Sequence, residues 1–546
     1  MKIAMAQVNP VIGDFRKNGE KLVEYTRKAK DLGCDLVVFP ELSISGYPPG
    51  DLLEKEDFVT AQMETFDTLV KTISGIGVIC GMVRRNPSSK GPKLFNSAAL
   101  FENGNILAFR DKQLLPTYDI FDETRYFKPG TGTSPFRYKG LNLGITICED
   151  IWNDDDTTLD RIHYDLNPIA DLAAQGVDLF INVSASPFHA GKGHVRDTML
   201  TSIARKYRTP LIFTNQVGGN DTILFDGLSC AMDSTGDFLA RAWDFREDLV
   251  VVDTASKSSK DIHPVSLSIT ESIFKALVTG TRDYVRKCGF TRAVLGSSGG
   301  IDSAVTAAIA AEALGPGNVL TLFMPSMYTS RKNFDDTRDL AANLGIGFQV
   351  VPIDDLYSEF LKLSGEFDPA RPGITEQNLQ ARIRGTILMA FSNKEGRILL
   401  STGNKSEMAV GYATLYGDMC GGLAVIGDLP KKKVYDMAAY VNQSGIKIPE
   451  SIISKAPSAE LAPDQKDQDD LPPYDTIDAV VEGYVEKHMS VDQLVASGLP
   501  REAVKHLVGR INRSEYKRYQ APPILRVTSK AFGPGRRYPM AQNFTL

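Results

Sequence analysis

Short apolar runs alternate with longer amphipathic segments along the first half of the chain. Each run is long enough for one strand and is followed by polar residues. The segments between several runs, such as residues 22–33 and 196–208, have apolar positions at helical spacing. Runs that are apolar on both faces and alternate with helices predict sheets covered by helix layers, an α/β fold. The strand-like runs are residues 35–42, 76–83, 141–150, 177–186 and 209–217.

A second alternating pattern begins beyond residues 254–268, where the composition turns small, polar and charged, as is typical of a domain linker. There, a strand-like run at residues 291–296 leads into an alanine-rich helical segment at 304–315. A chain of 546 residues also exceeds what one hydrophobic core usually supports. We therefore expect two α/β domains, residues 1–253 and 269–546.

Two later segments have the composition of loops. Residues 454–478 are rich in Pro, Asp and Gln, and ordered loops of this length usually act as lids. The same composition also permits a disordered insert, and we favour the lid. Residues 524–544 are basic and rich in Gly and Pro, which predicts a C-terminal surface tail.

Composition and charge exclude several classes of protein. A formal net charge of −6 gives no basic field for nucleic acid, and no apolar run is long enough to span a bilayer. The six cysteines have neither zinc-site nor disulfide spacing, which favours a reducing compartment. We expect a cytoplasmic protein that binds neither nucleic acid nor membranes.

Three residues suited to amide hydrolysis stand at or just past the ends of strand-like runs. They are Glu41, Lys112 and Cys148. A thiol that attacks an amide needs a base that can later reprotonate the leaving amine, and a donor for the oxyanion. A neighbouring lysine lowers the pKa of a thiol, and an apolar setting raises the pKa of a glutamate so that it can shuttle a proton. Taken singly, each residue is better explained by packing, turn capping or solvation.

The sequence around these residues favours the catalytic interpretation. Residues 39–53, 112–127 and 147–152 closely resemble the nitrilase/amidase family, and specifically the glutaminase domain that is fused to NAD synthetases. The resemblance covers essentially residues 1–253. It implies an α-β-β-α sandwich of the nitrilase type, with two sheets between helix layers.

The same resemblance assigns roles in glutamine hydrolysis. It implies that Cys148 is the nucleophile that forms a thioester, that Glu41 is the general base, and that Lys112 stabilises the oxyanion. Glu123 matches a second glutamate that orients the lysine. The resemblance implies no metal or cofactor in this half. The positions that match glutamine contacts are Tyr118, Ser186 and Lys192.

A glycine- and serine-rich loop, GSSGGIDS at residues 296–303, lies between a strand-like run and the alanine-rich helical segment. Glycines let the backbone come close to a ligand, and the N–H groups at a helix start face an anion. The loop therefore predicts a phosphate or pyrophosphate site, distinct from the lysine-containing GxxxxGK[ST] loop. With its flanking elements it resembles the ATP pyrophosphatase superfamily, whose members adenylate a substrate and release pyrophosphate.

Four sequence segments further along the chain indicate which substrate the second domain uses. Residues 375–385, 401–418, 455–461 and 514–523 resemble the NAD synthetases, and the match spans roughly residues 270–530. The resemblance implies a doubly wound parallel sheet of the adenine nucleotide α-hydrolase type. It also implies ATP as co-substrate and deamido-NAD as acceptor. Triphosphate chemistry further needs Mg²⁺ to neutralise charge on the leaving pyrophosphate.

The resemblance to NAD synthetases also assigns residues to these ligands. It implies that Asp302 and Glu407 bind Mg²⁺. Lys431 and Ser458 match positions on the phosphate-clamping side, and the segment around Ser458 matches one that closes over bound nucleotides. The positions that match deamido-NAD contacts are Asn378, Glu407 and Lys517. Those that match ATP contacts are Gly296, Ser297, Ser298, Gly299, Gly300, Ile301, Asp302, Ser303 and Thr402.

Together the two domains predict a ligase that makes NAD from deamido-NAD, ATP and glutamine. ATP would adenylate the nicotinate carboxylate, pyrophosphate would leave, and ammonia from the Cys148 site would displace AMP. Because free ammonia is mostly protonated near neutral pH and would escape, the fusion suggests an internal passage. The resembled family commonly forms homo-oligomers.

Two alternatives belong to other classes. The first is a superfamily member with another acceptor, such as a GMP synthetase or a tRNA-thiolating enzyme. The former uses a Cys/His/Glu glutaminase and the latter needs basic surfaces or paired cysteines, and neither fits this sequence. The second is a binding protein that has lost the chemistry, which the intact Glu41, Lys112, Cys148 and SGGIDS disfavour.

Overall fold

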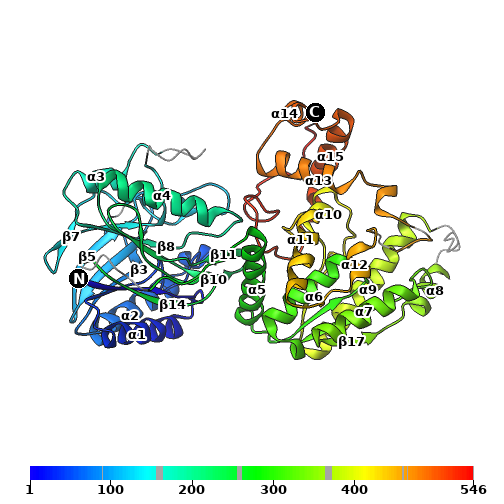
Figure 1. The fold of residues 1–546 in the computed structure, drawn as a ribbon, viewed down its shortest axis with the longest axis horizontal. Helices are drawn as coiled ribbons and strands as arrows, with labels where there is room; N and C mark the ends of the chain where they lie inside the picture. The colour runs from blue at the N-terminus through cyan, green and yellow to red at the C-terminus, as the bar shows by residue number, and fades with distance from the viewer. Residues whose placement is uncertain are drawn as a thin grey trace. The chain divides into compact units, whose positions relative to one another are not determined.

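The computed structural model describes residues 1–88, 90–154, 164–254, 261–362, 372–457, 460–463 and 465–544. These residues divide into two units, Met1–Leu267 and Ser268–Leu546 (Figure 1). Across the described ranges, no helix combines the length and the apolar character needed to cross a membrane. Each unit has its own sheets and its own hydrophobic core.

Unit 1 contains two six-stranded sheets, each with parallel strands at its centre and antiparallel strands at its edges. The first has the order β14 (Asp248–Asp253), β1 (Lys2–Gln7), β2 (Leu36–Val38), β3 (Gly77–Arg85), β4 (Leu94–Glu102), β5 (Asn105–Asp111). The second has the order β13 (Phe238–Arg241), β12 (Cys230–Met232), β9 (Leu211–Asn215), β8 (Leu179–Ser184), β7 (Leu141–Ile147), β6 (Phe136–Tyr138). A two-stranded ribbon joins β10 (Val217–Asn220) to β11 (Ile223–Asp226).

The two sheets of unit 1 pack face to face because their strands are apolar on both sides. In β1, Ile3 and Met5 join the core between the sheets, whereas Ala4 and Ala6 join the core beneath the helices. This alternation follows from the two-residue period of a strand. The helices α1 (Phe15–Asp31) and α2 (Glu56–Thr72) cover the first sheet, and α3 (Pro168–Ala173) and α4 (Lys192–Tyr207) cover the second (Figure 1). The unit is therefore the predicted α-β-β-α sandwich.

Unit 2 is built on a five-stranded sheet whose strands are all parallel. The strand order reverses after β15, since the chain adds β16 and β17 on one side and later β18 and β19 on the other. This is the predicted doubly wound topology, which places a crevice between β15 and β18. The strands are β15 (Ala293–Gly296), β16 (Val319–Phe323), β17 (Gly347–Val350), β18 (Ile398–Ser401) and β19 (Leu423–Ala424).

Helices of unit 2 pack on this sheet and on one another. Ile383 and Leu388 of α9 contact the sheet core, and the alanine-rich α6 packs against α5 and α11 as well as β15. Small side chains on α6 allow these neighbours to come close. The helices are α5 (Ile269–Lys287), α6 (Ile301–Leu314), α7 (Arg331–Leu344), α8 (Asp354–Lys362), α9 (Ile374–Glu395), α10 (Lys405–Val410) and α11 (Lys431–Val441).

The C-terminal residues correct one prediction. The first part of the expected surface tail is anchored in unit 2: Leu525 and Val527 are buried, and Ile524 and Phe532 join the core of α13 (Tyr474–Val481), α14 (Val491–Ala496) and α15 (Arg501–Arg513). Residues 533–544 are exposed or half-exposed, as predicted. Composition misled here because a few apolar side chains among many Gly, Pro and Arg residues are enough to fix the segment.

The predicted lid segment is shorter than its composition suggested. Residue 454 ends α12 (Glu450–Ser454), and α13 begins inside the segment at Tyr474. Between them, the described residues contain one short turn of 3₁₀ helix, Asp467–Asp469. Ser458 lies outside the described residues, so its predicted role stays a prediction.

A buried ion cluster holds the C-terminal segment against α10. The Lys405 ammonium lies 3.0 Å from Asp428 Oδ1 and 2.7 Å from Glu486 Oε1, and it also donates to Thr528 Oγ1 at 2.6 Å. Asp428 accepts in addition from the backbone N–H groups of Val527 and Thr528. Both Lys405 and Asp428 are fully buried, so each charge depends on the other for its stability.

We expect Lys405→Met to destabilise unit 2 by about 3–5 kcal/mol, because it leaves the buried Asp428 and the largely buried Glu486 without their cation. Local opening should speed amide hydrogen exchange at Val527 and Thr528. The matched control is Lys487→Met, which removes a pair with Glu482 that is more than half exposed and should change stability by less than about 1 kcal/mol. Equal exchange in the two variants would contradict this account.

Candidate active sites

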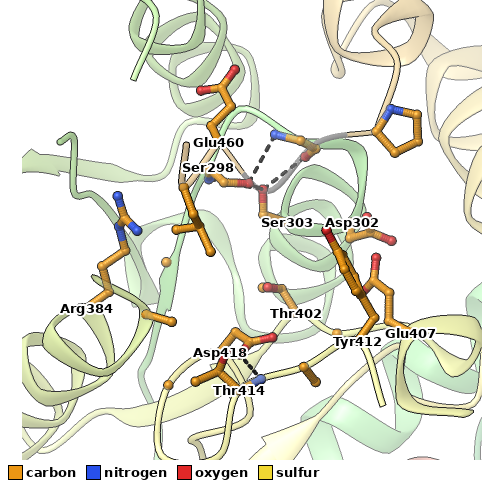
Figure 2. A pocket seen from close by; sticks show the side chains of 18 of the residues that line it. Ser298, Asp302, Ser303, Arg384, Thr402, Glu407, Tyr412, Thr414, Asp418 and Glu460 are labelled. Atoms are coloured by element: carbon orange, nitrogen blue, oxygen red, sulfur yellow. Dashed lines mark hydrogen bonds between the residues drawn. The ribbon is translucent and has the colours of Figure 1, made fainter. Parts of the chain in front are cut away.

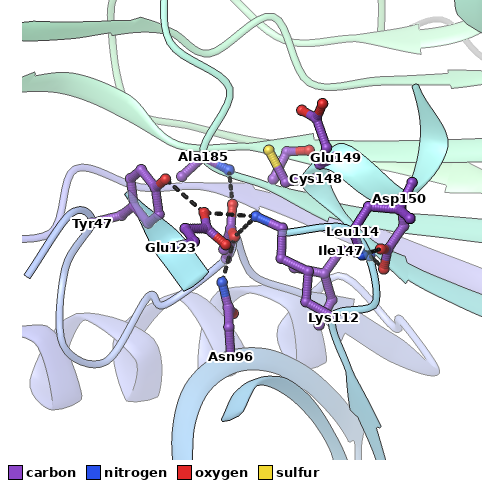
Figure 3. Close-up of polar contacts among 12 residues, drawn as sticks. Tyr47, Asn96, Lys112, Leu114, Glu123, Ile147, Cys148, Glu149, Asp150 and Ala185 are labelled. Atoms are coloured by element: carbon purple, nitrogen blue, oxygen red, sulfur yellow. Dashed lines mark hydrogen bonds and ion pairs between the residues drawn. The ribbon is translucent and has the colours of Figure 1, made fainter. Parts of the chain in front are cut away.

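A buried polar cluster in unit 1 brings together the three residues predicted to hydrolyse an amide (Figure 3). Lys112 directly follows β5, Cys148 directly follows β7, and Glu41 stands three residues beyond β2. The Lys112 ammonium lies 2.8 Å from Glu41 Oε1 and 2.8 Å from Glu123 Oε1. Glu41, Lys112, Glu123 and Cys148 are each at most 5% exposed. Side chains from separate strand ends therefore converge on one point that water barely reaches.

The Glu41 carboxylate is fixed from two sides. Asn96 Nδ2 donates to Oε1 at 2.6 Å, and the backbone N–H of Ala185 donates to Oε2 at 2.9 Å. Close packing adds to this restraint, because a Cβ at Gly81 would lie 2.6 Å from Glu41 Cα. Only glycine lets β3 pass so near the residue.

The Glu123 carboxylate accepts hydrogen bonds from two donors, both on Oε1. Besides the contact with Lys112, its Oε1 accepts from Tyr47 Oη at 2.7 Å. Its Oε2 is buried and finds no hydrogen-bond partner within the described part of the chain. Burial raises the pKa of Glu123 to about 7, the Lys112 ammonium opposes that rise, and the Glu41 carboxylate adds to it.

The charges around Cys148 correct the predicted thiol chemistry. Burial raises the pKa of the Cys148 thiol well above its ordinary value, and the Glu41 carboxylate raises it further. Lys112 lowers the pKa of the thiol as predicted, but its effect is outweighed. Burial lowers the pKa of the Lys112 ammonium, but the Glu123 and Glu41 carboxylates raise it more, so the pKa lies well above its ordinary value. The resting site thus holds a neutral thiol beside a charged lysine.

Cys148 occupies a sharp turn between β7 and a short 3₁₀ helix, Cys148–Ile151. Its φ is +45°, a left-handed conformation that is uncommon for a residue with a side chain. Such positions persist where the surrounding structure imposes them, and they are frequent at active sites. The turn places the side chain at the end of the strand, within the cluster (Figure 3).

The residues predicted to contact glutamine surround this cluster. Tyr118 Oη donates to both oxygens of Glu149, at 2.9 and 3.0 Å. The Ser186 hydroxyl is buried, and no group among the described residues bonds to it, while the N–H of Ser186 donates to Asn215 Oδ1 at 2.8 Å. Lys192 is the first residue of α4, and its ammonium donates to the carbonyl of Pro187 at 2.8 Å.

Sequence reasoning missed several supporting residues of this site. Asn96 is a polar side chain inside the apolar strand β4, and that interruption was the available signal. Tyr47 and Glu149 lie within the strings that carried the family resemblance but were not singled out. Asn215 ends β9 and is fully buried, so its role depends on a contact with residue 186 that the sequence does not reveal.

Unit 2 has a cavity of about 750 Å³ at the crevice where its strand order reverses (Figure 2). Most of the predicted ATP and deamido-NAD contacts line it: Gly296, Ser297, Ser298, Gly300, Ile301, Asp302, Ser303, Asn378, Thr402, Glu407 and Lys517. Gly299 is not among the described lining residues. It shapes the loop instead, since its φ is +77° and a Cβ there would lie 3.0 Å from Asn333.

Hydrogen bonds of the Ser303 hydroxyl fix the shape of the loop at residues 296–303. Ser303 Oγ accepts from the Ser298 N–H at 3.3 Å and donates to the Gly300 carbonyl at 3.0 Å. Gly300 is the N-cap of α6 and lines the cavity, so the N–H groups of the first turn face it. A helix start with free donors attracts phosphate oxygens.

Two carboxylates in the cavity share one lysine. Asp302 Oδ2 and Glu407 Oε1 both contact the Lys431 ammonium, the latter at 3.3 Å. Asn404 Nδ2 donates to Asp302 Oδ1 at 2.8 Å, and Asn404 caps α10 in a reciprocal box with Glu407. Burial raises the pKa of Glu407 to about 8, and Lys431 opposes that rise.

This acidic pair meets the requirements for Mg²⁺ brought in by a nucleotide. The two carboxylates already converge on a cation, the ammonium of Lys431. No cluster of three or more His, Cys, Asp or Glu side chains able to hold a metal occurs among the described residues. Mg²⁺ commonly takes one or two carboxylates and completes its shell with phosphate oxygens and water.

Two further predicted deamido-NAD contacts, Asn378 and Lys517, line the same cavity. Asn378 Oδ1 accepts from Thr414 Oγ1 at 2.7 Å. The Lys517 ammonium donates to the carbonyls of Gly411 and Ala413 at 2.9 and 2.8 Å, and burial lowers its pKa. Arg384, which was not singled out, also lines the cavity, and burial lowers its pKa to about 10.

Comparison with known proteins agrees with this division. Residues 2–263 match the carbon-nitrogen hydrolase family, and residues 273–521 match the NAD synthase family. The fold and the sites therefore define an enzyme that joins an amide-hydrolysing unit to an NAD-forming unit. The chain belongs to the family of glutamine-dependent NAD(+) synthetases, which are ligases.

Full-length relatives support that assignment. A glutamine-dependent NAD(+) synthetase of Synechocystis sp. is 45% identical, and the match covers 99% of both chains. One from Thermotoga maritima is 39% identical over 100% of this chain and 99% of its own. The structure of the enzyme from Acinetobacter baumannii in complex with adenosine diphosphate is similar, with a TM-score of 0.78 and 36% identity over 99% of this chain and 98% of that one.

We expect Glu41→Gln to lower the pKa of the Cys148 thiol while it slows glutamine hydrolysis by about 100-fold or more. The pKa falls because the substitution removes the negative charge that most strongly disfavours the thiolate. The pH dependence of Cys148 alkylation by iodoacetamide measures it, read from the mass of the labelled peptide. Cys288 is exposed and serves as the reference within each sample. An unchanged or higher midpoint for Cys148 would disprove the assignment.

Proposed function

We propose that this protein makes NAD from deamido-NAD, with ATP as co-substrate and glutamine as the source of nitrogen. The observation that supports the proposal is that each unit gathers the groups that one of the two reactions needs. Unit 1 has the buried cluster of Cys148, Lys112 and two glutamates, and unit 2 has a phosphate-binding loop beside an acidic pair. The names of its full-length relatives support the same reaction.

In unit 1, Glu41 takes the proton of Cys148 Sγ as the sulfur bonds to the amide carbon of glutamine. The carbonyl π electrons move to oxygen, and Lys112 stabilises the resulting negative charge. An ammonium has three donors, and Glu41 and Glu123 accept two of them. The third is available to the oxyanion.

Collapse of this intermediate releases ammonia. The carbon–nitrogen bond breaks, Glu41 returns its proton to the nitrogen, and a thioester remains on Cys148. Water then attacks the thioester while Glu41 accepts its proton, the carbon–sulfur bond breaks, and Glu41 returns that proton to Cys148 Sγ, with glutamate as the product. Tyr118, Ser186 and Lys192 hold the substrate, and the Ser186 hydroxyl, which has no hydrogen-bond partner among the described residues, can bond to glutamine.

In unit 2, residues 296–303 and Thr402 bind ATP, and Asn378, Glu407 and Lys517 bind deamido-NAD. Asp302 and Glu407 would hold Mg²⁺, which neutralises charge on the leaving pyrophosphate when bound. The nicotinate carboxylate attacks the α-phosphorus of ATP, and pyrophosphate leaves. Ammonia then attacks the adenylated carbonyl, loses a proton, and displaces AMP to give NAD.

The proposal also covers location and assembly. None of the six cysteines forms a disulfide, and all six lie within the described residues. Free thiols are typical of a reducing compartment, which supports the cytoplasm. The family resemblance supports a homo-oligomer. No observation favours another acceptor or a role confined to binding.

The two reactions should separate on a single substitution. Cys148→Ala should abolish NAD formation from glutamine, because no thioester can form, and should leave formation from ammonium at the parent rate. The comparison uses one assay of NAD with either nitrogen source. Cys230→Ala, another buried cysteine of unit 1, should keep both activities. Loss of both activities in folded Cys148→Ala would refute the assignment of two sites.

Asp302→Asn should slow NAD formation by roughly 100-fold or more with either nitrogen source, because adenylation precedes amination. Release of pyrophosphate from ATP and deamido-NAD measures the affected step directly. Asp436→Asn, which alters a half-exposed carboxylate of α11, serves as the matched control. Pyrophosphate release near the parent rate in Asp302→Asn would rule out its role.

A further inference from the structure

One buried carboxylate bonds to both segments that carry Lys112 and Cys148. Asp150 is 1% exposed. Its Oδ1 accepts from the backbone N–H groups of Gln113 and Leu114, at 3.0 and 2.8 Å, and its Oδ2 accepts from that of Ile147 at 3.1 Å (Figure 3).

The donors adjoin the reactive residues in the chain. Gln113 and Leu114 directly follow Lys112, and Ile147 directly precedes Cys148. The first two bonds cross 37 and 36 residues of sequence, and they join a loop at the end of β5 to the turn at the end of β7. Asp150 therefore fixes the distance between two segments that no strand pairing joins directly, since β5 and β7 belong to different sheets.

Local capping explains only part of this arrangement. The bond to Ile147 lies within the 3₁₀ turn and is an ordinary feature of a helix start. Bonds to Gln113 and Leu114 contribute nothing to that turn. Burial raises the pKa of Asp150 to about 6, and the N–H donors of Leu114 and Ile147 oppose that rise. Near neutral pH the group is thus a carboxylate that accepts on both oxygens.

We propose that Asp150 is a positioning residue of the glutaminase site, which sets Lys112 and the Cys148 turn at the separation needed for attack on the amide. It touches neither substrate nor reacting atoms. The inference rests on the proposed roles of Lys112 and Cys148 and adds the element that holds them together. A small error in such a separation is costly, because a misplacement near 1 Å can slow a reaction by about 100-fold.

Asp150→Asn tests the proposal with almost no change of shape. The amide keeps one acceptor oxygen and turns an NH₂ group toward backbone donors, so it cannot accept from Ile147 on one side and from Gln113 and Leu114 on the other at the same time. We expect the kcat of glutamine hydrolysis to fall on the order of 10- to 100-fold, with KM within about twofold of the parent, because the residues that hold glutamine are not displaced. NAD formation from ammonium should not change.

The matched control is Asp178→Asn. Asp178 Oδ2 accepts from the backbone N–H of Asn142 at 2.7 Å, so it also holds β7 through a carboxylate, but at the end remote from Cys148. The kcat and KM of Asp178→Asn should both equal those of the parent enzyme. A fall in kcat of the same size in both variants would show a general loss of strand order and would overturn the proposal.

Two further measurements separate positioning from folding. Asp150→Glu keeps the charge but lengthens the side chain. Because this changes the separation between Lys112 and the Cys148 turn, the variant should also lower kcat without changing KM. Combined with Cys148→Ala, Asp150→Asn should bind glutamine with the same Kd as Cys148→Ala by itself. A weaker Kd, or a parent-like kcat in both Asp150 variants, would overturn the proposal. If Cys148→Ala still hydrolysed glutamine, the proposed function itself would fail, whatever Asp150 does.

Discussion

A lysine ammonium shared by two carboxylates, buried in unit 1 and partly exposed in unit 2, is the interaction on which the site of each unit depends. Lys112 lies between Glu41 and Glu123 in unit 1, and Lys431 lies between Asp302 and Glu407 in unit 2. Charges without water are stable only if they are paired and held in place. Each trio must therefore be built from rigid strand and helix ends, and the sandwich and the parallel sheet supply those ends.

With both carboxylates ionised, each trio would carry one negative charge more than its lysine can neutralise, and burial opposes that state by raising the pKa of Glu123 to about 7 and that of Glu407 to about 8. In unit 1, burial and the Glu41 carboxylate keep the neighbouring thiol protonated, so the nucleophile becomes reactive only when a base takes its proton. In unit 2, the proposed Mg²⁺ would favour the ionised form of both carboxylates. Under the proposed function, one arrangement of charges thus serves acid–base chemistry in one site and cation binding in the other.

Local signals in the sequence predicted α/β domains, and the family resemblance predicted the sandwich of unit 1 and the doubly wound sheet of unit 2. GSSGGIDS predicted a phosphate loop, and its residues, Gly299 excepted, line the cavity. The failures concern properties that many residues determine together. The pKa of Cys148 depends on burial and on Glu41 as well as on Lys112, and the anchoring of residues 524–532 depends on a buried cluster distant in sequence.

The protonated state of Cys148 affects how readily oxidants react with this residue. Peroxides and similar oxidants attack thiolates, and they reach exposed sulfur before buried sulfur. A nucleophile that is a neutral thiol, 5% exposed, is therefore shielded from them until glutamine arrives. Exposed Cys288 meets such oxidants first. In this way, the residue that releases nitrogen for the synthesis of NAD, itself a redox cofactor, is protected from changes in the redox state of its surroundings.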